Sequence, residues 1–298
     1  RGTIHLPVQR RAVYGPCVRL TVEGLQGGHS GVEIHKNRAN ANKLLTRFLY
    51  MCQEKYDLRL ADIQTGGLPN AIPREAWCLC AVPSGCKESV RVDWNVFAAD
   101  VEEEFSATEK TMEFLLDSAD HQDKVIDKDT SRRLITALQG VHNGILSMCQ
   151  DIELVETSSN LGIVEIGSGE AKVLILARSS NDTMMEYIQE MQECCFNMAG
   201  MKVEYGGQYG AWQPNFESPI TATMVNVYKE IFQEDAQVQV CHAGLECSII
   251  GGKYPQMDLV SFGPTLRSPH TPDERCNIPS VEKFWIFLQA LLAQIPEK

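Results

Sequence analysis

The sequence predicts an α+β domain, built of antiparallel sheets with helices on one face, followed by the C-terminal part of an α/β domain. Three observations carry this prediction. Strand-like and helical stretches follow a β-α-β-β-α-β order early in the chain, a related order returns before Tyr205, and a different alternation follows. With 298 residues, 44% of them hydrophobic, the chain can bury one large or two medium cores.

The first half opens with a strand and a helix. Residues 17–23 alternate like a strand, and residues 37–56 carry Leu44, Leu45 and Phe48 at helical spacing. The pattern then predicts strands at 58–65, 74–82 and 110–117 and a helix at 87–104. We expect these elements to form one antiparallel sheet with its helices on one face.

A second half repeats much of this order. The pattern predicts helices at 129–148 and 182–198 and strands at 154–167, 171–178 and 202–205. No matching sequence repeat accompanies the two halves. The predicted duplication therefore concerns only the order of the elements.

The composition changes after Tyr205. Residues 206–219 are rich in glycine, proline and aromatic side chains and are typical of a linker. Beyond it we expect helices at 219–233, 245–251 and 279–295 and strands at 237–241 and 257–261. Two strands are too few for a complete α/β sheet, so we expect the remaining strands to come from outside this chain.

Charge and composition exclude several classes of function. The net charge is −12 and no Lys/Arg cluster appears, which argues against nucleic-acid binding. No apolar stretch approaches the roughly 20 residues that span a bilayer. The eleven cysteines lack zinc-finger spacing, so we expect reduced thiols in a cytoplasmic protein. The chain starts at Arg1 with no signal-peptide pattern, which suggests a fragment or a processed product.

In the stretch GLQGGHSGVEIH, the core GGHSG places His29 among three glycines, between a predicted strand and a predicted helix. Glycine is costly unless the backbone needs its freedom or another group approaches closely. One interpretation is that His29 is a hydrogen-bonding group exposed at a strand end. The alternative is a glycine-rich turn in which His29 caps the following helix.

The stretch CHAGLEC places His242 and Glu246 four residues apart, where a predicted strand ends and a helix begins. Ligands of α/β sheets commonly bind at such strand ends. The alternative is an ordinary helix N-terminus with incidental polar residues.

The stretch GPTLRSPHTPDE carries His270 in a proline-stiffened loop with Asp273 and Glu274 close behind. Neutral imidazole is the commonest side-chain metal ligand, and a nearby carboxylate can fix its tautomer. One histidine makes no metal site, however, so this loop alone leaves the assignment open.

Taken together, GGHSGVEIH, NAIPRE, HAGLEC and FGPTLRSPHTPDE resemble the aminoacyl-histidine (Xaa-His) dipeptidases, a branch of the co-catalytic zinc exopeptidases. The resemblance covers nearly the whole chain. It implies that residues 1–10 end one segment of a catalytic domain, residues 11–208 form a lid and dimerisation domain, and residues 209–298 form the C-terminal part of the catalytic domain.

The resemblance also implies roles for individual residues. His29 would help to hold the oxyanion that develops on the scissile carbonyl, and His270 would bind metal. The positions implied to bind substrate are Asn70, Arg178, Gly244 and Glu246. Of these, Arg178 suits the terminal carboxylate of a peptide, because its planar fork can bind a carboxylate in a bidentate way.

The sequence is therefore interpreted as part of a zinc-dependent dipeptidase acting on unblocked dipeptides, Xaa-His or broader. The family uses two zinc ions per active site, for which Mn²⁺ or Co²⁺ can substitute, and its lid can form a homodimer. The family's other metal ligands and its general base are not found here, so we expect this chain alone to be inactive. The alternatives are a non-catalytic binding or dimerisation module and a related zinc hydrolase of acylated amino acids.

Overall fold

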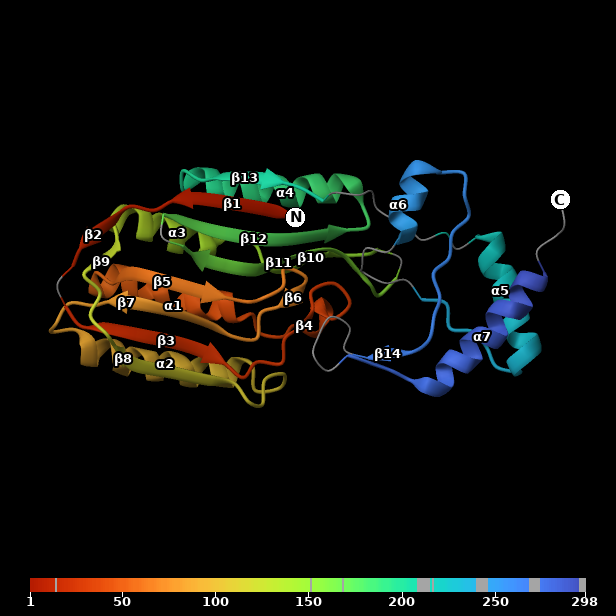
Figure 1. Cartoon of the computed structure of the whole chain (residues 1–298), viewed down its shortest axis with the longest axis horizontal. Helices are drawn as coiled ribbons and strands as arrows, with labels where there is room; N and C mark the ends of the chain where they lie inside the picture. The colour runs from red at the N-terminus through yellow and green to blue at the C-terminus, as the bar shows by residue number, and fades with distance from the viewer. Residues whose placement is uncertain are drawn as a thin grey trace.

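The computed structural model describes residues 1–13, 15–150, 152–167, 169–207, 215, 217–239, 246–267 and 274–294. Its main feature is one large sheet with the strand order β13-β1-β12-β11-β5-β7-β3-β8, in which β10 also pairs with β11 (Figure 1). The strands of this sheet are β1 (Gly2–Pro7), β3 (Cys17–Glu23), β5 (Arg59–Thr65), β7 (Ala76–Ala81), β8 (Glu113–Ala119), β10 (Gly144–Met148), β11 (Val155–Ile166), β12 (Glu170–Ser179) and β13 (Lys202–Tyr205). Short pairs join β2 (Arg10–Ala12) to β9 (Lys124–Ile126), β4 (Gly28–His29) to β6 (Ala71–Ile72), and β14 (Leu266–Arg267) to β15 (Arg275–Cys276).

The predicted duplication of element order is confirmed. From the centre of the sheet outward, the first half has the order β5-β7-β3-β8 and the second has β11-β12-β1-β13. The halves meet where β5 pairs with β11, at Thr65 opposite Val164 and Gln64 opposite Glu165. Because every pairing is antiparallel, β3, β5 and β12 run in the same direction and finish at the same end of the sheet.

The first strand of the second half comes from the start of the chain. β1 lies between β12 and β13, with Gly2 opposite both Ile175 and Tyr205. Its side chains alternate in burial, and Ile4 and Leu6 enter the core. Residues 1–10 are expected to end a catalytic-domain segment, but β1, which they contain, is a strand of this sheet. The first half is thus inserted between β1 and the rest of the second half.

Four helices cover one face of the sheet, as predicted. They are α1 (Ala41–Tyr56), α2 (Lys87–Glu104), α3 (Lys128–Gly140) and α4 (Asp182–Met198). One large side chain from each helix is no more than 1% exposed, and all four lie in a single apolar cluster with the strands: Phe48, Trp94, Leu134 and Phe196. The two halves therefore share one core, in which Phe48 and Trp94 pack edge to face with ring centroids 4.7 Å apart.

The predicted helix over 129–148 is wrong beyond Gly140, where α3 ends. Lys43 donates from Nζ to the carbonyl oxygen of Leu138 at 2.8 Å and satisfies part of the helix C-terminus. Gly144 then adopts φ +101°, which reverses the chain into β10. The residues after Gly144 pair with the neighbouring strand β11, which helical spacing could not reveal.

The C-terminal part contains α5 (Pro219–Phe232), α6 (Glu246–Lys253) and α7 (Ile278–Ala293), close to the predicted helices. The strand predicted at 257–261 is wrong, and the described part of 237–241 is not a strand either. A strand exists only where a neighbour pairs with it, and the described residues supply none here. None of the described helices is long and apolar enough to cross a bilayer. Each described cysteine is a free thiol.

α7 is apolar on more than one side. Phe287 and Leu291 pack against Met224 and Val227 of α5. On its other surface, Ile278 is 82% and Trp285 56% exposed. Large apolar side chains left in solvent in this way usually mark a surface that another part of a protein covers.

Candidate functional site

Three residues singled out in the sequence lie at the same end of the sheet. His29 follows β3, Asn70 follows β5, and Arg178 is near the end of β12. Since β3, β5 and β12 run in the same direction, the topology brings all three to one end, on the side of the C-terminal helices (Figure 1). This convergence is a property of the fold and not of sequence spacing.

The β4–β6 pair brings His29 and Asn70 next to each other. His29 lies opposite Ala71 in this pair, and the backbone N–H of Ser30 donates to the carbonyl oxygen of Asn70 at 2.9 Å. The amide of Asn160 in β11 donates to the carbonyl oxygen of Ala71 at 2.8 Å. The segment that carries Asn70 is thereby fixed to the sheet.

Arg178 is connected to the same segment through β11. It lies directly opposite Ser158 of that strand, two positions from Asn160. A cross-strand pair places both side chains on the same face of the sheet. The imidazole, the asparagine and the guanidinium are therefore held by neighbouring, hydrogen-bonded elements.

Sequence reasoning missed an asparagine network behind these residues. Asn40 caps the N-terminus of α1, and its amide donates to the side-chain oxygens of Asn143 at 3.1 Å and Asn160 at 3.3 Å. Asn40 and Asn160 are 5% and 1% exposed. The available signal was an asparagine in the middle of the predicted strand at 154–167, because a buried amide needs specific partners.

The imidazole of His29 is held by its own turn. Nδ1 accepts hydrogen bonds from the backbone N–H groups of Gly31 at 3.1 Å and Val32 at 3.0 Å. A ring nitrogen that accepts from N–H groups carries no proton, so the neutral ring has its proton on Nε2. Nδ1 therefore closes the turn before the 3₁₀ helix η1 (Ile34–Lys36), and Nε2 is the donor nitrogen. His29 is only 7% exposed, so the interpretation of a group exposed at a strand end is wrong, and the side chain that caps α1 is that of Asn40.

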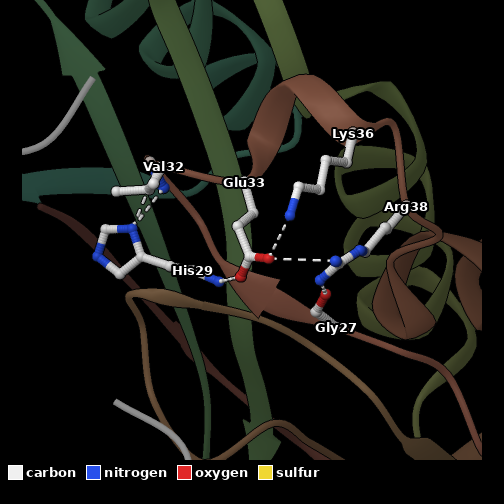
Figure 2. Close-up of polar contacts among 7 residues, drawn as sticks. Gly27, His29, Val32, Glu33, Lys36 and Arg38 are labelled. Atoms are coloured by element: carbon white, nitrogen blue, oxygen red, sulfur yellow. Dashed lines mark hydrogen bonds and ion pairs between the residues drawn. The ribbon is translucent and has the colours of Figure 1, made fainter. Parts of the chain in front are cut away.

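An ion-pair network lies on the other side of the His29 backbone (Figure 2). The Glu33 carboxylate accepts from the His29 backbone N–H at 3.0 Å and contacts Lys36 at 2.8 Å and Arg38 at 3.1 Å. Burial raises the pKa of Glu33, but the hydrogen bonds from Lys36 and the His29 backbone and the charge of Arg38 outweigh it, so this pKa is lower than usual. Glu33 is therefore ionised at neutral pH.

The glycines before His29 are required by this network and by β6. Gly28 has φ +134°, and a Cβ there would lie 2.5 Å from Nη1 of Arg38 and 2.6 Å from Oε2 of Glu33. Gly27 has φ +60°, and a Cβ there would lie 2.8 Å from the carbonyl oxygen of Ile72. The close approach that these glycines permit is thus to other parts of this protein.

A buried carboxylate fastens both ends of the loop. Glu109 is 6% exposed, and its two oxygens accept from the backbone N–H of Gln26 at 2.8 Å and of Ala39 at 3.0 Å. Residues 27–38, with His29 among them, lie between these anchor points. The loop is therefore attached to the core at its entry and at its exit.

Replacing Glu109 by Gln should destabilise the chain by about 1–3 kcal/mol, because a carboxamide offers one acceptor where two N–H donors need one each. The free energy of unfolding, measured by urea denaturation, tests this. Glu102→Gln, on the exposed surface of α2, is the matched control and should change stability by no more than about 0.5 kcal/mol. Equal stability of the two variants would show that Glu109 does not anchor the loop.

The remaining site residues lie elsewhere or outside the described structure. Glu246 is the exposed first residue of α6, and the structure brings it into no described contact with His29. Gly244 and His270 lie outside the described residues. Within the described ranges, no group of three or more His, Cys, Asp and Glu side chains could hold a metal ion. These residues alone therefore do not fit the expected zinc pair.

Comparisons with known proteins agree with the motifs. The sequence profile of the peptidase dimerisation domain of the M20 family matches residues 20–119, which is the first half of the sheet. The chain is 38% identical to the cytosol non-specific dipeptidase of Escherichia coli (strain K12), over 99% of this chain and 62% of that protein. It superposes on the aminoacylhistidine dipeptidase from Vibrio alginolyticus with a TM-score of 0.85 and 36% identity, covering 100% of this chain and 61% of the other. The chain thus spans about six tenths of the length of the relatives it matches. Its residues 20–119 match the dimerisation domain of the M20 peptidases, and over its whole length it is similar to two dipeptidases.

Proposed function

We propose that this chain is the lid and the C-terminal part of a dipeptidase that hydrolyses unblocked dipeptides, Xaa-His or broader. The observation that carries the proposal is His29, whose Nδ1 is occupied by two backbone N–H groups, so that Nε2 is the donor. The relatives at 38% and 36% identity are both named as dipeptidases. In this proposal, residues 11–208 together with β1 form the lid, and residues 209–298 belong to the catalytic domain.

Three residues of the lid would act on the substrate. His29 would donate from Nε2 to the oxygen of the scissile carbonyl as negative charge develops there, which is the usual role of an oxyanion donor. Arg178 would bind the terminal carboxylate through its planar fork, and Asn70 would hydrogen-bond the peptide beside it. Their convergence at one end of the sheet supports a single substrate site there.

The metal would be held mainly by residues outside the described structure. We propose two zinc ions, with Mn²⁺ or Co²⁺ as substitutes, and His270 as one ligand. Zinc bound there would polarise the carbonyl of the substrate and lower the pKa of a bound water. The exposed apolar surface of α7 and the unpaired segment 257–261 support a larger catalytic domain, which a longer chain would complete.

This chain alone should show no dipeptidase activity, because the described residues do not assemble a metal site. The purified chain and the full-length enzyme are assayed side by side with Zn²⁺ or Mn²⁺ and a set of Xaa-His dipeptides. Turnover only by the full-length enzyme is expected. Turnover by the chain alone, well above background, would contradict the fragment proposal.

The same assay tests the substrate class. Full-length enzyme that cleaves N-acylated amino acids in preference to free dipeptides would favour the related hydrolase instead.

The match of residues 20–119 to a dimerisation domain supports a homodimer formed through the lid, which sedimentation analysis of the full-length enzyme tests. We place this enzyme in the cytoplasm, in line with the name of its Escherichia coli relative.

A further inference from the structure

We propose that Glu33 is a positioning residue for His29, holding the backbone on both sides of Gly28 so that the imidazole keeps one tautomer and one direction. The inference rests on the function proposed for His29 and names a residue that acts through it. In Figure 2, the contacts drawn from Glu33 and Arg38 go to the backbone of His29 and Gly27.

The two oxygens of the Glu33 carboxylate have different partners. Oε2 accepts from the His29 backbone N–H at 3.0 Å, and Oε1 contacts Nη2 of Arg38 at 3.1 Å. Nη1 of Arg38 in turn donates to the carbonyl oxygen of Gly27. These contacts form a closed path from Gly27 through Arg38 and Glu33 to His29, and Gly28 lies inside it.

Gly28 makes such a restraint necessary. A glycine at φ +134° has no Cβ to limit its rotation, so the local backbone does not fix the direction of the next residue. The ion pair supplies that restraint from outside. The ion pair also occupies the space where a Cβ of residue 28 would lie. Only glycine therefore fits beside the ion pair, and the ion pair restrains the backbone that glycine leaves free.

The ion pair between Glu33 and Arg38 is partly buried, which strengthens its hold on the backbone. The side chains of Glu33 and Arg38 are 21% and 16% exposed, so water screens their attraction less than at an open surface. Lys36 contacts the same carboxylate at 2.8 Å, but its side chain is 43% exposed, and none of the described contacts joins it to the backbone of residues 27–29. Lys36 therefore offers a matched control.

The ring depends on the same backbone. The carbonyl oxygen of His29 accepts from the Glu33 N–H at 3.0 Å, which closes the turn whose N–H groups donate to Nδ1. If residues 27–29 rotate, Nδ1 leaves these donors and the ring proton is no longer confined to Nε2. An error of about 1 Å in placing a reacting group can reduce the rate about 10²-fold.

The test compares Glu33→Gln, Arg38→Met and Lys36→Met in the full-length enzyme. Glu33→Gln keeps the size of the side chain but leaves one acceptor oxygen in place of two. Arg38→Met removes the contacts of the guanidinium with Glu33 and with the carbonyl oxygen of Gly27, and it leaves the carboxylate in place. Both should lower kcat about 10- to 100-fold with KM changed less than about twofold. Lys36→Met should leave kcat within about twofold of the parent. In ¹⁵N-histidine NMR spectra at neutral pH, the His29 signals should indicate a single Nε2–H tautomer in the parent and a mixture in the first two variants.

Normal kcat and a single tautomer in Arg38→Met or in Glu33→Gln would overturn the proposal. If one of these two variants fails to fold, the other alone decides the test. A loss of kcat in Lys36→Met as large as in Glu33→Gln would also overturn it, because the effect would then follow the surface charge. His29→Asn separates this failure from failure of the proposed function. If His29→Asn lowers kcat and the Glu33 variants do not, only the positioning role is wrong; if His29→Asn leaves kcat normal, the catalytic role of His29 is wrong.

Discussion

Replacing His29 by Asn in the full-length enzyme is expected to lower kcat by about 10²–10³-fold, the usual cost of one lost oxyanion donor, with little loss of thermal stability. The side-chain oxygen of Asn lies near the position of Nδ1 and can still accept from Gly31 and Val32. It has no group at the position of Nε2. The substitution therefore keeps the cap and removes only the donor, and KM should change less than kcat because Arg178 and Asn70 are intact.

His29→Ala completes this experiment. Alanine removes the cap as well as the donor, so kcat should fall as in His29→Asn. The free energy of unfolding of His29→Ala should be lower than that of His29→Asn by about 0.5–2 kcal/mol, as for other lost caps. Metal content should stay unchanged in both variants, since neither touches a proposed ligand. A kcat of His29→Asn within about threefold of the parent would show that His29 serves only as a cap.

The helices and the central strands of the fold could be predicted from the sequence, because their signals are local. The helix over 182–198 and the strand over 202–205 agree with α4 and β13 residue for residue. β1 and β10 could not be assigned to the sheet in this way. The partners of β1 lie more than 160 positions away, at residues 170–175 and 202–205, and β10 lies in a segment whose spacing predicts a helix. Nothing in local periodicity reports such pairings.

The site shows the same division between local and distant signals. The glycines around His29 pointed to a special backbone, and the structure explains Gly28 by the nearby ion pair. The anchoring role of Glu109 was not predictable, because its partners Gln26 and Ala39 lie 83 and 70 positions away. The element that positions a group is thus often remote from it in sequence, while the motif that contains the group is local.

Replacing His270 by Ala in the full-length enzyme is expected to remove metal and activity together. His270 is the proposed zinc ligand from this chain, and a ligand lost from a site with few protein donors lowers metal affinity directly. Metal per protein, measured by elemental analysis after dialysis, should fall below that of the parent, and dipeptide hydrolysis should fall with it. His35→Ala, at an exposed position of η1, is the matched control and should keep both. His29→Asn should keep the metal but lose activity, so the three histidines separate binding of metal from stabilisation of the oxyanion. A His270→Ala enzyme that retains the full metal content would show that His270 is not a ligand, whatever happens to its rate.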